Sequence, residues 1–167
     1  MKLDVSELLK KERSQKELHL EINEEKLYDG SDYINLLEPI KLDGTLSKVG
    51  DILTVDCTIH TVLELTCSRC VEKFSYPIDM TIEERLTTND KANKDDDLIF
   101  INSDTIDITE IIENNIILTL PIQGLCKEDC KGLCHKCGTD LNLSTCHCND
   151  DDVDPRLAKL KDLFLTD

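Results

Sequence analysis

Two long stretches near the middle of the chain alternate between apolar and polar residues with a period of two. Apolar residues occupy the odd positions of 53–66 and the even positions of 74–82, and only Thr61 and Val62 break the rule. Successive side chains of a strand point to opposite faces, so both stretches predict half-buried strands. The short segment Cys67-Ser68-Arg69-Cys70 separates them. We therefore expect a long antiparallel hairpin with this segment at its tip.

Shorter alternating segments predict further strands at 18–22, 40–46 and 98–101. Pro77 falls on the polar face of the second long strand. Proline has no amide hydrogen to donate to a ladder, so this strand should lie at a sheet edge or carry a bulge.

Three segments have helical features. Ser6 is a candidate cap for a brief helix over 7–11. Asp107-Ile108-Thr109-Glu110 resembles a capping box, and the isoleucines that follow share one helical face until Pro121, although so many isoleucines leave a strand possible. Asp154-Pro155 starts a final amphipathic segment.

These elements predict an α+β fold. We expect an antiparallel β-sheet with a long central hairpin, two or three helices and a cysteine-rich zinc lobe. The predicted division is a core domain over residues 1–125, a zinc-binding lobe over 126–148, and an acidic linker with a C-terminal helix over 149–167.

Charge narrows the choice of partners. The 167 residues include 19 Lys and Arg against 35 Asp and Glu, a formal net charge of -16. Proteins that bind nucleic acid electrostatically usually present a basic face, so a basic protein is the more natural partner. No nucleotide-binding, metalloprotease or serine-hydrolase motif occurs, and we expect neither an enzyme nor a small-molecule substrate.

The compartment affects how the nine cysteines are interpreted. The N-terminus lacks the apolar core of a signal peptide, and no apolar run approaches the ~18 residues of a membrane span. A cytoplasmic protein without membrane contact is expected, and there clustered cysteines bind metal more often than they form disulfides. Disulfides or inert thiols are the alternative.

Eight cysteines form four close pairs. The spacings are Cys67-x2-Cys70, Cys126-x3-Cys130, Cys134-x2-Cys137 and Cys146-x-Cys148. Four thiolates suit tetrahedral zinc, so we predict two structural Zn²⁺ ions, one held by the first two pairs and one by the last two. Other pairings, or replacement of a thiolate by His135 or His147, stay open at this point. Because such sites leave no position for water, a catalytic role is disfavoured. Cys57 stands alone on an apolar strand face and is expected to be an inert core thiol.

These motifs together resemble the YceD family. The resemblance rests on sequence segments throughout the chain, including Ser6-Glu7-Leu8-Leu9, Leu65-Thr66-Cys67-Ser68-Arg69-Cys70 with Phe74, Ile106-Asp107-Ile108-Thr109-Glu110, Leu120-Pro121, Gly132-Leu133-Cys134-x-x-Cys137-Gly138-x-Asp140-Leu141-Asn142, Cys146-x-Cys148 and Asp154-Pro155-Arg156-Leu157. His135 departs from the family pattern, in which proline is common there. Some relatives lack the second cysteine set but keep the Cys-x2-Cys pair at the hairpin tip and a cysteine after Leu-Pro, which supports pairing 67/70 with 126/130.

The resemblance implies a bacterial or plastid protein needed for accumulation of large-subunit (23S) ribosomal RNA. The leading hypothesis is a zinc-stabilised ribosome-assembly factor that binds a basic ribosomal protein or a large-subunit precursor, with direct rRNA contact disfavoured by charge. The alternatives are a redox-responsive zinc-thiolate switch or chaperone and, less favoured, a metallohydrolase.

Overall fold

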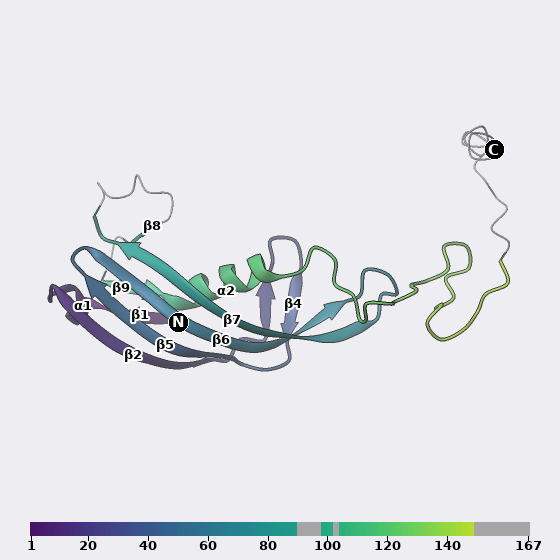
Figure 1. Ribbon diagram of the computed structural model, residues 1–167, viewed down its shortest axis with the longest axis horizontal. Coiled ribbons are helices and arrows are strands. Elements are labelled where there is room, and N and C mark those ends of the chain that lie inside the picture. Colours follow the sequence, from purple (N-terminus) through teal and green to yellow (C-terminus); the bar gives the residue numbers. More distant parts are fainter. Residues whose placement is uncertain (90–97, 102–103, 149–167) are drawn as a thin grey trace, which may run out of the picture.

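The structure is a computed structural model that describes residues 1–89, 98–101 and 104–148. The acidic linker and the helix expected near the C-terminus lie outside these residues. Within the described ranges the chain is mostly antiparallel β-sheet with two helices, and none of the helices there is long and apolar enough to cross a membrane. Figure 1 shows a long curved sheet, with a cysteine-rich segment extending from one of its ends.

Most strands belong to one seven-stranded sheet. Its strands are β2 (Arg13–Ile22), β3 (Lys26–Tyr28), β4 (Tyr33–Leu36), β5 (Ile40–Val49), β6 (Ile52–Thr66), β7 (Lys73–Thr87) and β8 (Leu98–Phe100). A separate two-stranded sheet contains β1 (Lys2–Asp4) and β9 (Thr105–Asp107). The helices are α1 (Ser6–Leu9) and α2 (Ile108–Thr119).

Strand β6 organises the large sheet. One of its edges pairs with β7 from Ile52 to Thr66, which confirms the predicted long hairpin. The other edge pairs first with β5 and then, at Leu63 and Glu64, with β4. Strand β6 therefore has neighbours on both edges along most of its length, and the tip of the hairpin projects beyond them toward the cysteine-rich segment (Figure 1).

One face of this sheet carries the main core, and α2 belongs to the same core cluster. The odd-numbered residues of β6 from Leu53 to Leu63 are buried as the alternation predicted, with Ile59 fully buried. Thr61 also lies on this face, and its hydroxyl donates to the carbonyl of Glu38 at 2.9 Å, which explains how a polar residue fits there. The predicted isoleucine face of α2 is buried at residues 108, 111, 112 and 116, so helix rather than strand is correct here.

Several local details differ from the sequence analysis. Asp107 occupies the N-cap position of α2, but its side chain makes no capping hydrogen bond, so the predicted capping box is wrong. The short hairpin of β3 and β4 and the first half of β2 were missed. Residues 13–17 are polar throughout, and their strand is defined by backbone pairing with β5, not by alternation.

Pro77 lies at a sheet edge, as predicted. It pairs with Val62 of β6, while the only other described partner of β7, β8, pairs with Arg85–Thr87 at the far end. The stretch of β7 that contains Pro77 is therefore an open edge among the described residues, where a missing amide hydrogen costs nothing.

Candidate metal sites

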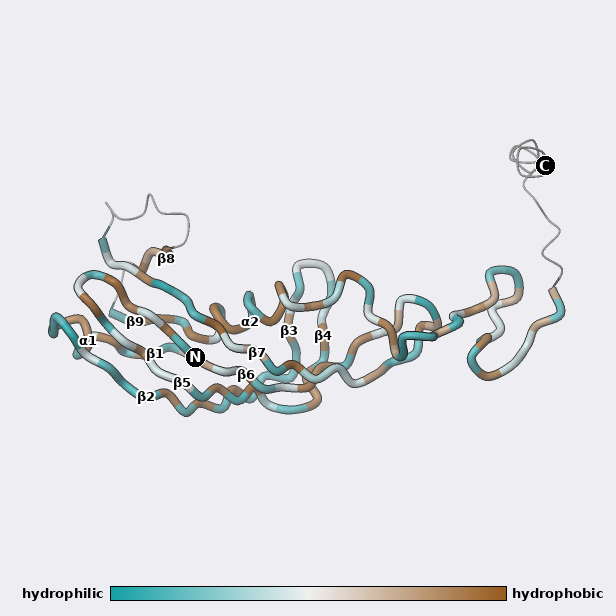
Figure 2. Tube along the Cα trace, viewed as in Figure 1, coloured by the Kyte–Doolittle hydropathy of each residue, from teal (hydrophilic) through white to brown (hydrophobic). Residues whose placement is uncertain are grey.

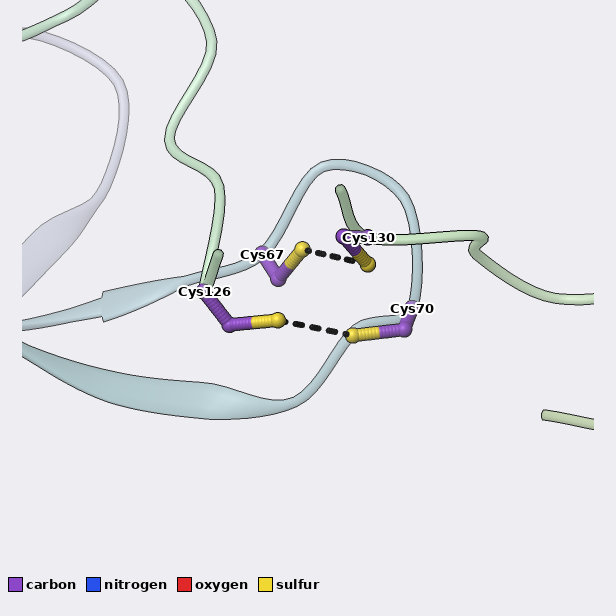
Figure 3. A group of neighbouring side chains, drawn as sticks. All are labelled: Cys67, Cys70, Cys126 and Cys130. Carbon is purple, nitrogen blue, oxygen red and sulfur yellow. Dashed lines mark hydrogen bonds between the residues drawn. The ribbon is translucent and has the colours of Figure 1, made fainter. Parts of the chain in front are cut away.

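Four cysteines gather at the tip of the long hairpin. Cys67 and Cys70 come from the tip, and Cys126 and Cys130 come from the chain that leaves α2 (Figure 3). All four sulfurs lie within 4.8 Å of one another, and three of the side chains are buried. We call this group site one. Phe74 and Leu125 pack beside it in a small cluster separate from the main core.

The sulfur spacing in site one fits a tetrahedral ion better than disulfides. The Cys67–Cys130 and Cys70–Cys126 sulfur pairs lie 3.7 and 3.6 Å apart (Figure 3). Zn–S bonds of about 2.3 Å in a tetrahedron place the sulfurs about 3.8 Å apart. A disulfide requires about 2.05 Å. The donor set therefore fits a tetrahedrally coordinated metal ion, and zinc is consistent with it.

The pKa values of the thiols in site one also favour a bound cation. The backbone amide of Cys126, helped by those of Cys70 and Arg69, lowers the pKa of Cys67 to about 6. Burial, followed by the neighbouring thiols, raises the pKa of Cys126 to about 12. Four thiolates at this spacing repel one another, so they cannot all ionise without a cation among them. A divalent ion such as zinc would remove this conflict.

The second group of four, site two, consists of Cys134, Cys137, Cys146 and Cys148, whose sulfurs also lie within 4.8 Å of one another. It is more open than site one, since Cys137 is exposed and only Cys134 is buried. The hydroxyl of Thr139, 3.1 Å from the sulfur of Cys137, lowers the pKa of that thiol to about 6. Neither group includes His135 or His147 among the described residues.

The two Cys-x2-Cys segments fold in the same way. In the first, the amide of Val71 donates to the carbonyl of Cys67 at 3.0 Å, and in the second that of Gly138 donates to Cys134 at 2.8 Å. The residue after the second cysteine is left-handed in both, with φ of 64° at Val71 and 72° at Gly138. This turn brings the paired sulfurs to one side, where both can meet one ion.

Several hydrogen bonds connect the two sites. Asn142, in the loop of site two, donates from its side-chain amide to the sulfur of Cys130 at 3.4 Å and accepts from the amide of Lys131 at 2.9 Å. Arg69 donates from its guanidinium to the carbonyl of Cys130 at 2.8 Å. Gly132 lies so close that a Cβ there would be 2.9 Å from the carbonyl oxygen of Arg69. The sequence analysis missed these supporting residues, because no spacing rule marks an asparagine that will donate a hydrogen bond to a cysteine sulfur.

The structure thus groups the eight cysteines into the two sets that the sequence analysis proposed, and it places Cys57 apart. Cys57 is buried on β6 within the main core. Its partner in the register is Gly44, where a Cβ would lie 2.4 Å from the Cα of Cys57. Burial raises the pKa of this thiol to about 11.

The fold and the sites define a class of protein: an elongated antiparallel sheet whose central hairpin carries one four-cysteine site at its tip and leads to a second. Residues 55–164 match the family described as Large ribosomal RNA subunit accumulation protein YceD. The chain belongs to the YceD family.

Comparison with known proteins identifies relatives in bacteria and plants. YlbN of Bacillus subtilis is 31% identical over 136 residues, which cover 80% of this chain and 79% of that protein. ML1660 of Mycobacterium leprae is 29% identical, over 77% of this chain and 61% of that protein. The chloroplastic large ribosomal RNA subunit accumulation protein YCED homolog 1 of Arabidopsis thaliana is 25% identical, over 75% of this chain and 48% of that protein. No solved structure matches significantly.

Proposed function

We propose that this protein is a cytoplasmic, zinc-stabilised factor for assembly of the large ribosomal subunit, and that it supports accumulation of 23S rRNA. The observation that carries the proposal is the family match over residues 55–164. The zinc component rests on the sulfur spacing in site one, which suits a tetrahedral ion. The role is that of a binding protein, not of an enzyme.

A basic ribosomal protein, free or within a large-subunit precursor, is the proposed partner. The net charge of -16 favours encounter with a basic protein and disfavours contact with phosphate. This charge supports protein contact.

Depletion with complementation tests the cellular role. Loss of the protein should lower 23S rRNA relative to 16S rRNA, and the wild-type gene should restore it. A variant with Cys67→Ser and Cys70→Ser should fail to restore it, whereas Cys57→Ala, a matched loss of a cysteine outside both sites, should succeed. Unchanged 23S rRNA after depletion would reject the assembly role.

Metal analysis tests the zinc component separately. The purified chain should contain two zinc ions, and the Cys67→Ser, Cys70→Ser variant should contain one. A metal-free wild-type protein that keeps the same fold would contradict the structural role of zinc. Labelled large-subunit proteins and rRNA fragments, each titrated against the zinc-loaded chain, then separate protein contact from RNA contact.

A redox-responsive switch is the second candidate, and the exposure of Cys137 in site two favours it. Peroxide should then release zinc from site two before site one, and a thiol reductant with added zinc should reverse the change. If both ions are retained under peroxide that oxidises free cysteine, the switch is excluded while the assembly role is unaffected.

A further inference from the structure

A groove of about 350 Å³ lies on the part of the molecule remote from both cysteine sites, at the junction of its two sheets. Its walls are α2, the end of β7, β8 and β9. None of its lining residues is a cysteine or belongs to the proposed metal sites. It therefore calls for an explanation of its own.

The groove combines a buried apolar floor with an exposed apolar rim. Leu86, Ile106 and Ile111 form the floor and are at most 7% exposed. Phe100 is 37% exposed and Leu118 is 83% exposed at the rim. Figure 2 shows β8 as a hydrophobic stretch beside this region. Apolar side chains exposed along one groove are typical of a surface that binds another molecule.

The side-chain charges that line the groove are all negative. Glu84, Asp107 and Glu110 line it, and no Lys, Arg or His is among its described lining residues. Asp107 is paired with the N-terminal ammonium of Met1 at 3.3 Å, which leaves Glu84 and Glu110 for a ligand. Asn115 donates to Glu84 at 2.7 Å, which fixes that carboxylate beside the helix. Glu110 is exposed and has no ion-pair partner among the described residues. Carboxylates beside an apolar floor match a cationic ligand that also has apolar groups.

We propose that this groove binds a short basic segment of a partner protein, with one or two large apolar side chains on the floor and lysine or arginine at the carboxylates. The inference rests on the proposed function, since a basic ribosomal protein is the partner proposed there. RNA is a poorer occupant, because its phosphates would meet the carboxylates of Glu84 and Glu110. A second copy of this chain is also poorer, because two chains of charge -16 repel each other.

Three synthetic peptides of equal length provide the first test on the full zinc-loaded chain. One alternates lysine with leucine and phenylalanine, the second has alanine in place of the large apolar residues, and the third has glutamate in place of lysine. The first should shift the amide NMR signals of Phe100, Glu110 and Leu118. The other two should bind at least about tenfold more weakly, because the second lacks the apolar side chains for the floor and the third lacks the positive charges for the carboxylates. Equal binding of all three, or shifts confined to the sheet face away from α2, would overturn the proposal.

Surface variants test the same point without disturbing the core. Glu110→Lys and Leu118→Lys should each weaken binding of the first peptide by about tenfold. Glu17→Lys on β2 and Leu143→Lys, whose leucine is 85% exposed in the cysteine-rich segment, are matched controls that should bind normally. Equal weakening by the controls would show that general charge, not the groove, binds the peptide. Since the readout is peptide affinity, it separates failure of the groove from failure of the ribosomal role.

Discussion

The side-chain amide of Asn142, which lies between the two cysteine pairs of site two, donates a hydrogen bond at 3.4 Å to the sulfur of Cys130 in site one. Asp140 holds the asparagine in place, because its carboxylate accepts from both the backbone and the side-chain amide of Asn142, at 2.8 and 2.9 Å. A donor to a thiolate offsets part of its charge and orients it toward the metal. The loop of site two therefore supports site one.

This relationship predicts that Asn142→Leu loosens zinc in site one without removing a ligand. Outer-shell partners typically change metal affinity by about 10–100-fold, and the lower end is expected for one bond to sulfur. Competition with a chromogenic chelator measures both zinc affinities. Asn23→Leu, an exposed asparagine near the end of β2, is the control and should behave as wild type. Unchanged zinc affinities in Asn142→Leu would show that the bond has no energetic role.

The backbone conformation of Val71 predicts that glycine at this position stabilises the protein. It has a φ of 64°, a left-handed conformation that is costly for a β-branched residue, whereas Gly138 occupies the equivalent position without that cost. Val71→Gly should stabilise the zinc-loaded protein by about 1 kcal/mol, after the larger conformational entropy of unfolded glycine is subtracted.

Chemical denaturation of matched variants checks the sign. Val49→Gly is the control, because Val49 is 61% exposed, close to the 65% of Val71, and has no positive φ. It should destabilise by about 0.5–1 kcal/mol, and Gly138→Val should also destabilise the protein. If Val71→Gly were destabilising as well, the left-handed strain at Val71 would not be real.

The hairpin and the cysteine groups could be predicted for different reasons. Alternation over residues 53–66 and 74–82 reflects one buried and one exposed sheet face, so it reveals both strands directly. The cysteine groups could be predicted because cysteines that are close in sequence bind the same ion, so only a few combinations of the four pairs are possible. The polar residues 13–17 carry no such signal, because an edge strand can be held by backbone pairing alone.

The supporting contacts could not be predicted because they depend on the folded path of the chain. Asn142 reaches Cys130 only after the turn at Gly132 brings two loops together, and nothing local marks either residue for the other. The groove likewise forms between β8, β9 and α2, whose packing is a tertiary property. Sequence patterns specify faces of elements more readily than spaces between them.

Metal removal should unfold the cysteine-rich end and leave the sheet intact. Site one and its packed neighbours form a small cluster separate from the main core, so its stability depends on the ion. After chelation, residues 126–148 should lose amide hydrogen-exchange protection, while the central pairs of β5 and β6 keep theirs. Loss of protection throughout β5 and β6 would contradict this division. Restored protection after zinc is added back is the control for irreversible damage.

Cys57 should be the slowest of the nine cysteines to react. Cys57 is buried in the main core, which we expect to stay folded after zinc is removed, whereas the other eight cysteines then lose the metal and the folded segments that shield them. The raised pKa of Cys57, about 11, also leaves only about one thiolate in a thousand at pH 8. With zinc removed under reducing conditions, iodoacetamide and mass spectrometry should show modification of the other eight before Cys57. Rapid native alkylation of Cys57 would contradict its place in the core.

The same pKa shift gives a signed pH dependence. Because the raised pKa means that folding favours the neutral thiol, the stabilisation is complete below the ordinary cysteine pKa of 9.0 and is lost as pH rises through about 11. Cys57→Ala has no such group and should start less stable, since it leaves a small cavity in the core. The difference in unfolding free energy between wild type and Cys57→Ala should therefore shrink between pH 9 and 11. Denaturation of both proteins across that range measures it, and a constant difference would show that Cys57 keeps an ordinary pKa.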